Sequence, residues 1–232
     1  MDGIVRHHRY IMDATSRSSA ADRAFDHVRQ GILSRRYADN DLLAEGDIAR
    51  EVGISRTPVR EALLRLESQG MIRLLPKRGA LVLPVTAKEW QDVLATRLLL
   101  ETHCARAAIL AGRGPAVAGM LAGPLAELRD AAAAPDLARY VAADRDFHAA
   151  IVAADGNRIL TRLYGSLRDR QMRMGAANLL ADGQVDTLRM ATTVVDHQAI
   201  ADAIGSGDAD LADRLTREHL AHADLALRGA GG

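Results

Sequence analysis

Two short stretches of the chain combine residue types that could do chemistry. In the first, Asp144 and His148 stand four positions apart. On a helix they would share one face, where a carboxylate and an imidazole can reach one ion. In the second, Arg56 and Arg60 have the same spacing, and arginine can donate two hydrogen bonds to a guanine base. The first pair indicates metal binding and the second indicates DNA binding, but each pair alone is also compatible with ordinary surface residues.

The segment around the two arginines predicts the start of a helix. Ser55 or Thr57 can cap this helix, and Pro58 is tolerated in its first turn because proline's missing amide hydrogen has no partner there. Arg56 and Arg60 lie away from the apolar side of the helix, so both should point outward. Thr57 and the free amides of the helix start could hold a phosphate group.

The elements next to this helix complete a compact head. Apolar residues at helical spacing predict a first helix from Ala20 to about Arg36, and a second short helix around Asp47–Val52 is stopped by Gly53. The second helix, a tight turn and the arginine-bearing helix form a helix-turn-helix arrangement. Residues 1–19 are polar and lack periodicity, so we expect a mobile tail there.

A β-hairpin should follow the arginine-bearing helix. Ile72–Leu75 and Ala80–Leu83 are short apolar runs, and the turn between them is typical of a hairpin. This turn carries two positive charges and a glycine, namely Lys77, Arg78 and Gly79. The hairpin would be the wing of a winged helix-turn-helix domain over residues 20–85.

The rest of the chain is predicted to be helical. Thr86 and Glu89 form a capping box, with Val85 and Trp90 as its hydrophobic staple, so a new helix should begin there and run to about Ala111. About six further helices should follow. Their expected breaks lie at 112–115, 123–124, 135, 155–157, 183 and 205–207.

Composition supports this mostly α fold and narrows the functional class. Hydrophobic residues make up 48% of the chain and aromatic residues only 3%, which favours helices over a strand-rich sandwich. The 30 basic and 30 acidic residues cancel, which argues against a protein that coats nucleic acid non-specifically. A single cysteine, Cys104, suggests a buried thiol in a reducing compartment. With no membrane-spanning run and no signal-type segment, we expect a cytoplasmic protein without a membrane partner.

Residues 20–85 resemble the GntR family of bacterial regulators. The resemblance rests on the segment 55–63, on the turn 51–54 that precedes it and on the basic hairpin turn. It implies that Arg56, Thr57 and Arg60 contact bases and phosphates and that Gly79 lies at the wing tip. Many members of the family carry a DNA-contacting arginine after the glutamate of the second helix. Here Gly46 occupies that position, which predicts a different operator sequence or affinity.

Residues 86–228 resemble the effector domain called FCD, found in the FadR-type branch of the GntR family. The resemblance rests on the order of Asp144 and His148, then Asp196-His197, then Arg217-Glu-His219. It implies that Asp144, His148, His197 and His219 ligate a divalent metal inside a helical bundle. Zinc is the default choice, while nickel, iron and manganese also suit three imidazoles and one carboxylate.

Two further residues of this domain have competing roles. His222, one turn beyond His219, is a rival for the last ligand position, although the family pattern favours His219. Arg97 aligns with an arginine that recurs at the cavity of such domains and could pair with an effector carboxylate. It could equally form an ion pair with Glu101 one turn away, and in either role Glu101 would orient it.

The resemblance implies a homodimeric transcription regulator, in function a repressor, that binds a double-stranded DNA operator with an inverted repeat. A small organic acid bound at open metal positions would then change its affinity for the operator. Two alternatives stay open. The site could belong to a metal-dependent enzyme, although no separate base or nucleophile is grouped with the ligands. The metal could also be purely structural.

Overall fold

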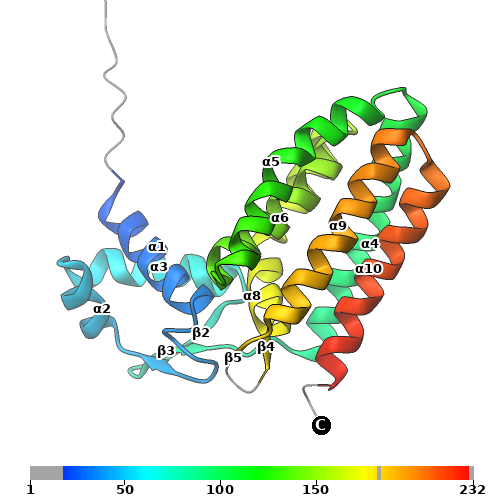
Figure 1. The fold of residues 1–232 in the computed structure, drawn as a ribbon. Coiled ribbons are helices and arrows are strands. Elements are labelled where there is room, and N and C mark those ends of the chain that lie inside the picture. Colours follow the sequence, from blue (N-terminus) through cyan, green and yellow to red (C-terminus); the bar gives the residue numbers. More distant parts are fainter. Residues whose placement is uncertain (1–17, 182–183, 230–232) are drawn as a thin grey trace, which may run out of the picture. The chain divides into compact units, whose positions relative to one another are not determined.

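The computed structural model of the protein describes residues 18–181 and 184–229 (Figure 1). Within these residues the protein contains ten helices, one three-stranded sheet and one two-stranded sheet, so the fold is mostly α as predicted. The chain divides into two compact units. Among the described residues, one unit holds those up to Arg29 together with Leu42–Leu81, and the other holds Gln30–Asp41 and those from Val82 onward.

The first helix, α1 (Ala20–Leu33), begins with a capping box that the sequence analysis placed in the tail. The Ser19 hydroxyl accepts a hydrogen bond from the Asp22 amide at 3.0 Å, and the Asp22 carboxylate accepts one from the Ser19 amide at 3.2 Å. Ser19 is therefore part of the folded head, while residues 1–17 of the expected tail lie outside the described residues. At its other end α1 stops before Arg36, because Arg35 adopts a left-handed conformation with φ 58°.

The helix-turn-helix forms as predicted from α2 (Glu45–Val52) and α3 (Arg56–Ser68). Gly53 ends α2 in the left-handed region, with φ 69°. The apolar side of α3 is completely buried, so burial of this side holds the helix in place. Its buried residues are Val59, Ala62, Leu63 and Leu66. Ser55 takes the N-cap position, but its side chain makes no capping hydrogen bond.

The wing belongs to a sheet of three strands rather than two. Strands β2 (Ile72–Leu75) and β3 (Gly79–Val82) form the predicted hairpin, with β3 one residue earlier than expected. A strand that the sequence analysis missed, β1 (Leu42–Leu43), pairs antiparallel with β3. Two residues are too few to show an alternating pattern, so no sequence signal marked β1.

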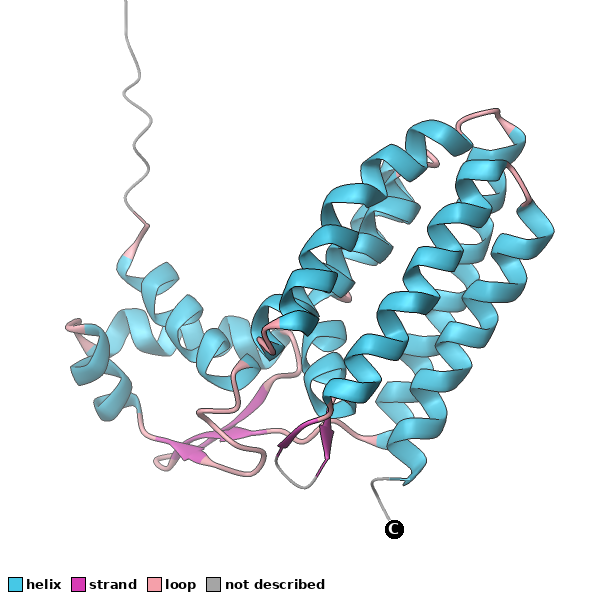
Figure 2. Cartoon of the chain, viewed as in Figure 1, coloured by secondary structure: helices cyan, strands magenta, loops and turns pink. Residues whose placement is uncertain are grey.

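The other unit is built almost entirely of helices (Figure 2). Helix α4 is followed by six more helices in the described part of the chain, the number expected from the sequence. The seven helices are α4 (Ala87–Leu110), α5 (Gly114–Ala133), α6 (Leu137–Ala153), α7 (Arg158–Gly165), α8 (Arg168–Asn178), α9 (Thr187–Ser206) and α10 (Ala209–Gly229). A short antiparallel pair that was not predicted, β4 (Leu180–Ala181) and β5 (Gln184–Val185), precedes α9. The expected break at Gly183 lies outside the described residues.

The predicted capping box opens α4. The Thr86 hydroxyl accepts a hydrogen bond from the Glu89 amide at 3.1 Å, and Val85 packs against the apolar cluster that contains Trp90. The Thr86 cap and the hydrophobic staple are therefore present, whereas the Glu89 carboxylate accepts a hydrogen bond from Arg170 Nε at 2.9 Å. Helix α4 ends at Leu110, one residue before the predicted end.

The long helices pack into a bundle. Helix α5 packs against α6 and α9, and α10 packs against α4 and α9 (Figure 1). A hydrogen bond of 3.0 Å from the Tyr140 hydroxyl to the Met190 carbonyl ties α6 to α9 inside the core. At the start of α5 the backbone of Gly114 approaches α9 so closely that a Cβ atom would lie 2.4 Å from the Ile204 carbonyl oxygen.

The helix break expected at Gly123–Pro124 is wrong, because α5 continues through both residues. A proline inside a helix removes one hydrogen bond and costs about 3 kcal/mol. Leu121, Leu125 and Leu128 on the same helix are almost completely buried in the bundle core. Burying one leucine side chain contributes roughly 1.5 to 3 kcal/mol, so packing outweighs the local penalty.

Candidate metal centre and nucleic-acid interface

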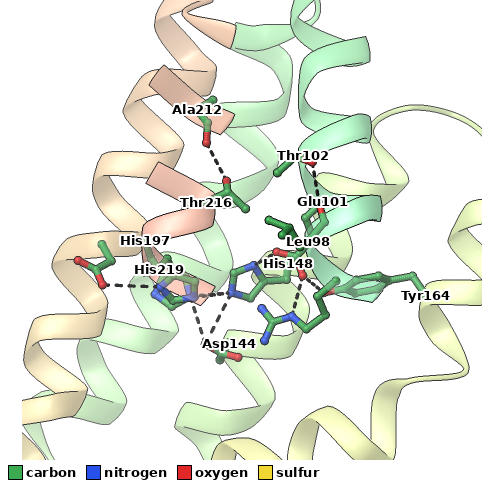
Figure 3. A network of polar contacts seen from close by, with 12 residues as sticks. Leu98, Glu101, Thr102, Asp144, His148, Tyr164, His197, Ala212, Thr216 and His219 are labelled. Atoms are coloured by element: carbon green, nitrogen blue, oxygen red, sulfur yellow. Dashed lines mark hydrogen bonds and ion pairs between the residues drawn. The ribbon is translucent and has the colours of Figure 1, made fainter. Parts of the chain in front are cut away.

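Four residues from three helices form a cluster in the interior of the bundle (Figure 3). Asp144 and His148 come from α6, His197 from α9 and His219 from α10. Each offers one ligand atom, and these atoms lie within 4.8 Å of one another. His148 and His197 are completely buried, and His219 is 6% exposed. The family resemblance assigned these same residues to a metal, and folding brings all four together.

Local hydrogen bonds fix where these helices start. The Asp136 side chain caps α6 by accepting from the Arg139 amide, and the Asp186 side chain caps α9 by accepting from the Arg189 amide. Asp208, just before α10, accepts from the Leu211 amide at 2.9 Å. Each cap satisfies a helix-start donor that would otherwise have no partner. The three ligand-bearing helices therefore have well-defined first turns.

The imidazole Nε2 atoms of the cluster face one another. His148 Nε2 lies 3.1 Å from His197 Nε2 and 3.2 Å from His219 Nε2. Asp144 Oδ1 lies 3.2 Å from His197 Nε2. Ligand atoms about 2.1 Å from one ion, at octahedral or tetrahedral angles, lie roughly 3.0 to 3.4 Å apart. These three separations therefore match the edges of a metal coordination shell, while Asp144 Oδ1 and His148 Nε2 are farther apart, at 3.8 Å.

The opposite ring nitrogens show why the centre of the cluster suits a cation. His197 Nδ1 lies 2.6 Å from the Thr193 carbonyl oxygen, and since a carbonyl only accepts, Nδ1 must carry the proton. His148 Nδ1 lies 2.8 Å from a carboxylate oxygen of Glu101. In neutral rings protonated on Nδ1, the Nε2 lone pairs converge without a hydrogen between them. A divalent cation would satisfy all of these lone pairs, so the residues fit a metal ion.

The pKa shifts keep His148, His219 and Asp144 in their ligating forms near neutral pH. Burial lowers the pKa of His148, and burial together with the neighbouring His197 lowers the pKa of His219 to about 4. Burial alone would raise the pKa of Asp144, but the contact with His197 and the charges of the neighbouring side chains bring it below its usual range. Neutral imidazoles and an ionised carboxylate are the forms that bind metals.

A cavity of about 580 Å³ adjoins the cluster. Asp144, His219 and Arg97 contribute to its wall, and Trp90, Leu94 and Met174 are among its apolar lining residues. A cavity of this size holds a small organic molecule. A molecule in it would therefore be next to the cluster and to a buried guanidinium group.

Arg97 combines the two roles considered from the sequence. Its Nε atom donates to Glu101 Oε1 at 2.7 Å, so the ion pair is present. Its Nη2 atom is buried and has no hydrogen-bond partner among the described residues. A buried donor without a partner costs free energy. Arg97 therefore retains a donor that a ligand carboxylate could satisfy.

His222 lies outside the four-residue cluster. Its side chain is 66% exposed, and its Nδ1 atom lies 3.5 Å from the Asp196 carboxylate. The sequence analysis missed how the site continues beyond the four-residue cluster, on the Nδ1 side of the His148 ring. Glu101 was considered only as a partner of Arg97, and Tyr164, whose hydroxyl donates to Glu101 at 2.5 Å, was not considered. No local pattern links a tyrosine to a glutamate so far away in the chain.

The candidate DNA-contacting residues of the head lie on its surface. Arg56, Thr57 and Arg60 are exposed on α3, on the side opposite its buried residues. The guanidinium of Arg56 lies against Gly46 of α2, since a Cβ atom built on Gly46 would be 3.2 Å from Arg56 Nη2. Gly46 stands where the resemblance led us to expect an arginine, and its lack of a side chain leaves space for Arg56.

In the hairpin turn, the side chains of Lys77 and Arg78 are exposed. Gly79 is partly buried and has φ 106°. A Cβ atom at this position would lie 2.2 Å from the Leu43 carbonyl oxygen. Close packing of β3 on β1 therefore requires glycine at position 79. This structural role is separate from the position at the wing tip that the resemblance implies.

Among the described residues, no helix is long and apolar enough to cross a membrane. Cys104 is buried as predicted, and burial raises the pKa of its thiol to about 11. A thiol in this state is unreactive near neutral pH. Neither feature adds a second candidate site.

Comparison with known proteins matches both parts of the chain to families. Residues 20–82 match bacterial regulatory proteins of the gntR family, and residues 92–222 match the FCD domain. An HTH-type transcriptional regulator from the unstable DNA locus of Streptomyces ambofaciens is 30% identical over 196 residues, covering 83% of this chain and 78% of that protein. A protein of Paenarthrobacter nicotinovorans, described as a probable D-xylose utilization operon transcriptional repressor, is 28% identical and covers 90% of this chain and 91% of its own.

Solved structures show the same fold. A GntR transcriptional regulator from Rhodococcus sp. RHA1 superposes with a TM-score of 0.78 at 22% identity, covering 93% of this chain and 100% of the other. McbR/YncC of E. coli superposes with a TM-score of 0.74 at 20% identity, with coverages of 91% and 98%. The two family matches, the relatives and the fold agree, and the chain belongs to the GntR family of transcriptional regulators, among the members that carry an FCD domain.

Proposed function

We propose that this GntR-family regulator binds an inverted-repeat DNA operator as a homodimeric repressor. A small organic acid, bound at a divalent metal in the FCD domain, would release it from the operator. One observation carries the regulatory part of the proposal. The Nε2 atoms of three histidines and one carboxylate converge beside a cavity that Arg97 also lines. A metal with an open position and a guanidinium can together bind one carboxylate.

The head supports DNA binding by this protein. Exposed arginines at the start of α3 can read base edges in the major groove, and the exposed basic turn before β3 can contact phosphates. One such helix reads only a few base pairs, so two heads on paired half-sites gain specificity. We keep the domain boundary between residues 85 and 86, since the family matches end at 82 and resume at 92.

For the metal we propose zinc at Asp144, His148, His197 and His219, with nickel, iron and manganese as alternatives. When bound, the ion would supply a Lewis-acidic centre with open coordination positions. The protein's own residues do the rest. The histidines and Asp144 would hold the ion, and Arg97, which lines the cavity, would pair with the acid.

The decisive experiment measures operator affinity by fluorescence anisotropy with zinc-loaded protein, with a panel of small organic acids present or absent. Gluconate belongs in the panel, because a gluconate operon repressor of Bacillus subtilis is 40% identical over 87 residues, 38% of this chain. We expect one acid to weaken operator binding, with less effect on Arg97→Ala. Chelation should abolish this response. Operator binding unaffected by every acid would contradict the sensory role.

A purely structural metal is the second candidate. Its support is that the cluster joins α6, α9 and α10, which are far apart in the chain. In that case chelation would lower thermal stability, while an acid that weakens operator binding would keep its full effect on the metal-free protein. The same titrations with and without chelator therefore separate the two candidates.

A further inference from the structure

The carboxylate of Glu101 contacts three side chains from three different helices (Figure 3). Its Oε1 atom accepts hydrogen bonds from Arg97 Nε at 2.7 Å and from the Tyr164 hydroxyl at 2.5 Å. Its Oε2 atom lies 2.8 Å from His148 Nδ1. Glu101 and His148 are completely buried, and Tyr164 is 2% exposed. The carboxylate therefore makes these contacts out of reach of water.

A buried carboxylate is stable only if its charge and lone pairs are satisfied. The guanidinium of Arg97 supplies the counter-charge, since its Nε atom lies 2.7 Å from Glu101 Oε1 in a buried ion pair. A carboxylate paired in this way accepts hydrogen bonds and does not donate them. Arg97 and Tyr164 both donate hydrogen bonds to Oε1, so the contact of Oε2 is with His148.

A carboxylate oxygen 2.8 Å from Nδ1 favours the His148 tautomer that is protonated on Nδ1, although the two atoms are not aligned for a linear hydrogen bond. With Nδ1 protonated toward Glu101, the lone pair of His148 Nε2 points at the centre of the four-residue cluster, 3.1 Å from His197 Nε2 and 3.2 Å from His219 Nε2. A negative acceptor also makes Nε2 a stronger electron donor. His197 has only a neutral backbone carbonyl in the equivalent place. Among the described contacts, His148 is therefore the ligand with the shortest approach to a carboxylate behind its ring.

We propose that Glu101 is a positioning residue of the metal centre, which fixes His148 in the Nδ1-protonated tautomer, and that Tyr164 holds the Glu101 carboxylate in place. This inference rests on the proposed metal site. It assigns to Glu101 a role beyond its ion pair with Arg97, and it assigns a role to Tyr164. It also means that Arg97, which lines the cavity, and the proposed ligand His148 both contact the carboxylate of Glu101.

The first test compares zinc affinities, measured by competition with a chromophoric chelator. Glu101→Gln keeps the shape of the side chain but removes its charge, and we expect about 10-fold to 100-fold weaker zinc binding. Tyr164→Phe removes only the hydroxyl and should weaken binding less. The matched control is Glu127→Gln, which breaks an exposed contact with Arg139 in the same domain and should leave zinc affinity unchanged.

The double variant asks whether Tyr164 acts through Glu101. In the Glu101→Gln background, Tyr164→Phe should cause no further loss of zinc affinity, because the carboxylate that the hydroxyl holds is already absent. Independent, additive losses would contradict the role given to Tyr164. If Glu101→Gln fails to fold because Arg97 loses its counter-charge, Tyr164→Phe alone decides, and wild-type affinity in that variant would overturn the proposal.

The second test reads the tautomer directly, by nitrogen-15 NMR of the histidine rings in metal-free protein. The wild type should show His148 protonated on Nδ1, and Glu101→Gln should shift it toward the other tautomer, an effect that loss of general stability would not produce. Unchanged tautomer and unchanged zinc affinity in both single variants would overturn this inference alone. A wild-type protein that binds no divalent metal would overturn the proposed metal site, and this inference with it.

Discussion

The Nε2 atoms of His148 and His197 lie 3.1 Å apart although the two residues belong to α6 and α9. Two imidazole nitrogens at this distance need a proton or a cation between them, since two facing lone pairs repel. The Nδ1 atom of His197 must carry its ring's proton toward the Thr193 carbonyl. A neutral His197 therefore presents a bare lone pair to the cluster, which is the reason to expect a metal there.

The first prediction concerns the choice between two histidines on α10. His219→Ala removes a ligand atom from the four-residue cluster and should deplete the divalent metal, whereas His222→Ala, at an exposed position, should retain about one ion per chain. The measurement is elemental analysis of protein purified without chelators or a histidine tag. Because an ion that binds only the folded state stabilises it by about 2.7 kcal/mol at a hundred times its Kd, His219→Ala should also lower Tm. Equal metal content in both variants would contradict the assignment.

The second prediction concerns the pH dependence of the metal-free protein. The pKa of His219 is lowered to about 4 by burial and by the neighbouring His197, against about 6.5 in an unfolded chain. Between these values the unfolded chain binds a proton that the folded protein does not, so the free energy of unfolding should fall as pH falls from 6.5 toward 4. Urea unfolding at a series of pH values measures this slope.

Two variants serve as controls for the pH dependence. His219→Gln removes one titrating ring and should reduce the slope, to which His148 still contributes because burial lowers its pKa too. His222→Ala should leave the slope as in the wild type, because His222 is exposed. A slope that persists unchanged in His219→Gln would show that other groups cause it.

The third prediction concerns sequence reading by α3. Arg56→Ala and Arg60→Ala should each weaken specific operator binding by about 1 to 3 kcal/mol if the side chains contact bases. Lys77→Ala, in the exposed turn before β3, should weaken binding to all DNA sequences alike, because phosphate contacts carry no sequence information. Anisotropy titrations with operator and with scrambled DNA separate the two effects. Unchanged operator affinity in both arginine variants would exclude α3 as the reading helix.

The fourth prediction concerns the wing. Gly79→Ala places a Cβ atom 2.2 Å from the Leu43 carbonyl oxygen at a residue with φ 106°. It should destabilise the head by more than about 1 kcal/mol and weaken DNA binding. Gly119→Ala is the matched control, since a Cβ atom there meets no other atom within 4 Å and α5 favours alanine. Thermal unfolding of both variants tests this, and equal stability would show that β3 does not need a glycine.

Local patterns in the sequence were sufficient to predict most helices and the wing. The capping box at Thr86 and the left-handed stop at Gly53 act within a few residues, so their effect can be read from neighbouring positions. Local patterns misled at Pro124, where the buried leucines of α5 outweigh the proline. They gave no indication of β1, a two-residue strand that forms by pairing with β3.

The ligand types and the spacing of Asp144 and His148 were also visible in the sequence, and the family resemblance supplied His197 and His219. Only the tertiary structure decided how these rings are oriented and what lies behind them. Glu101 meets both His148 and Tyr164 because α4, α6 and α7 pack together, and no residue spacing records a contact between helices. Sequence determines each helix through short-range hydrogen bonds and periodic burial, whereas the site depends on how separate helices pack against one another.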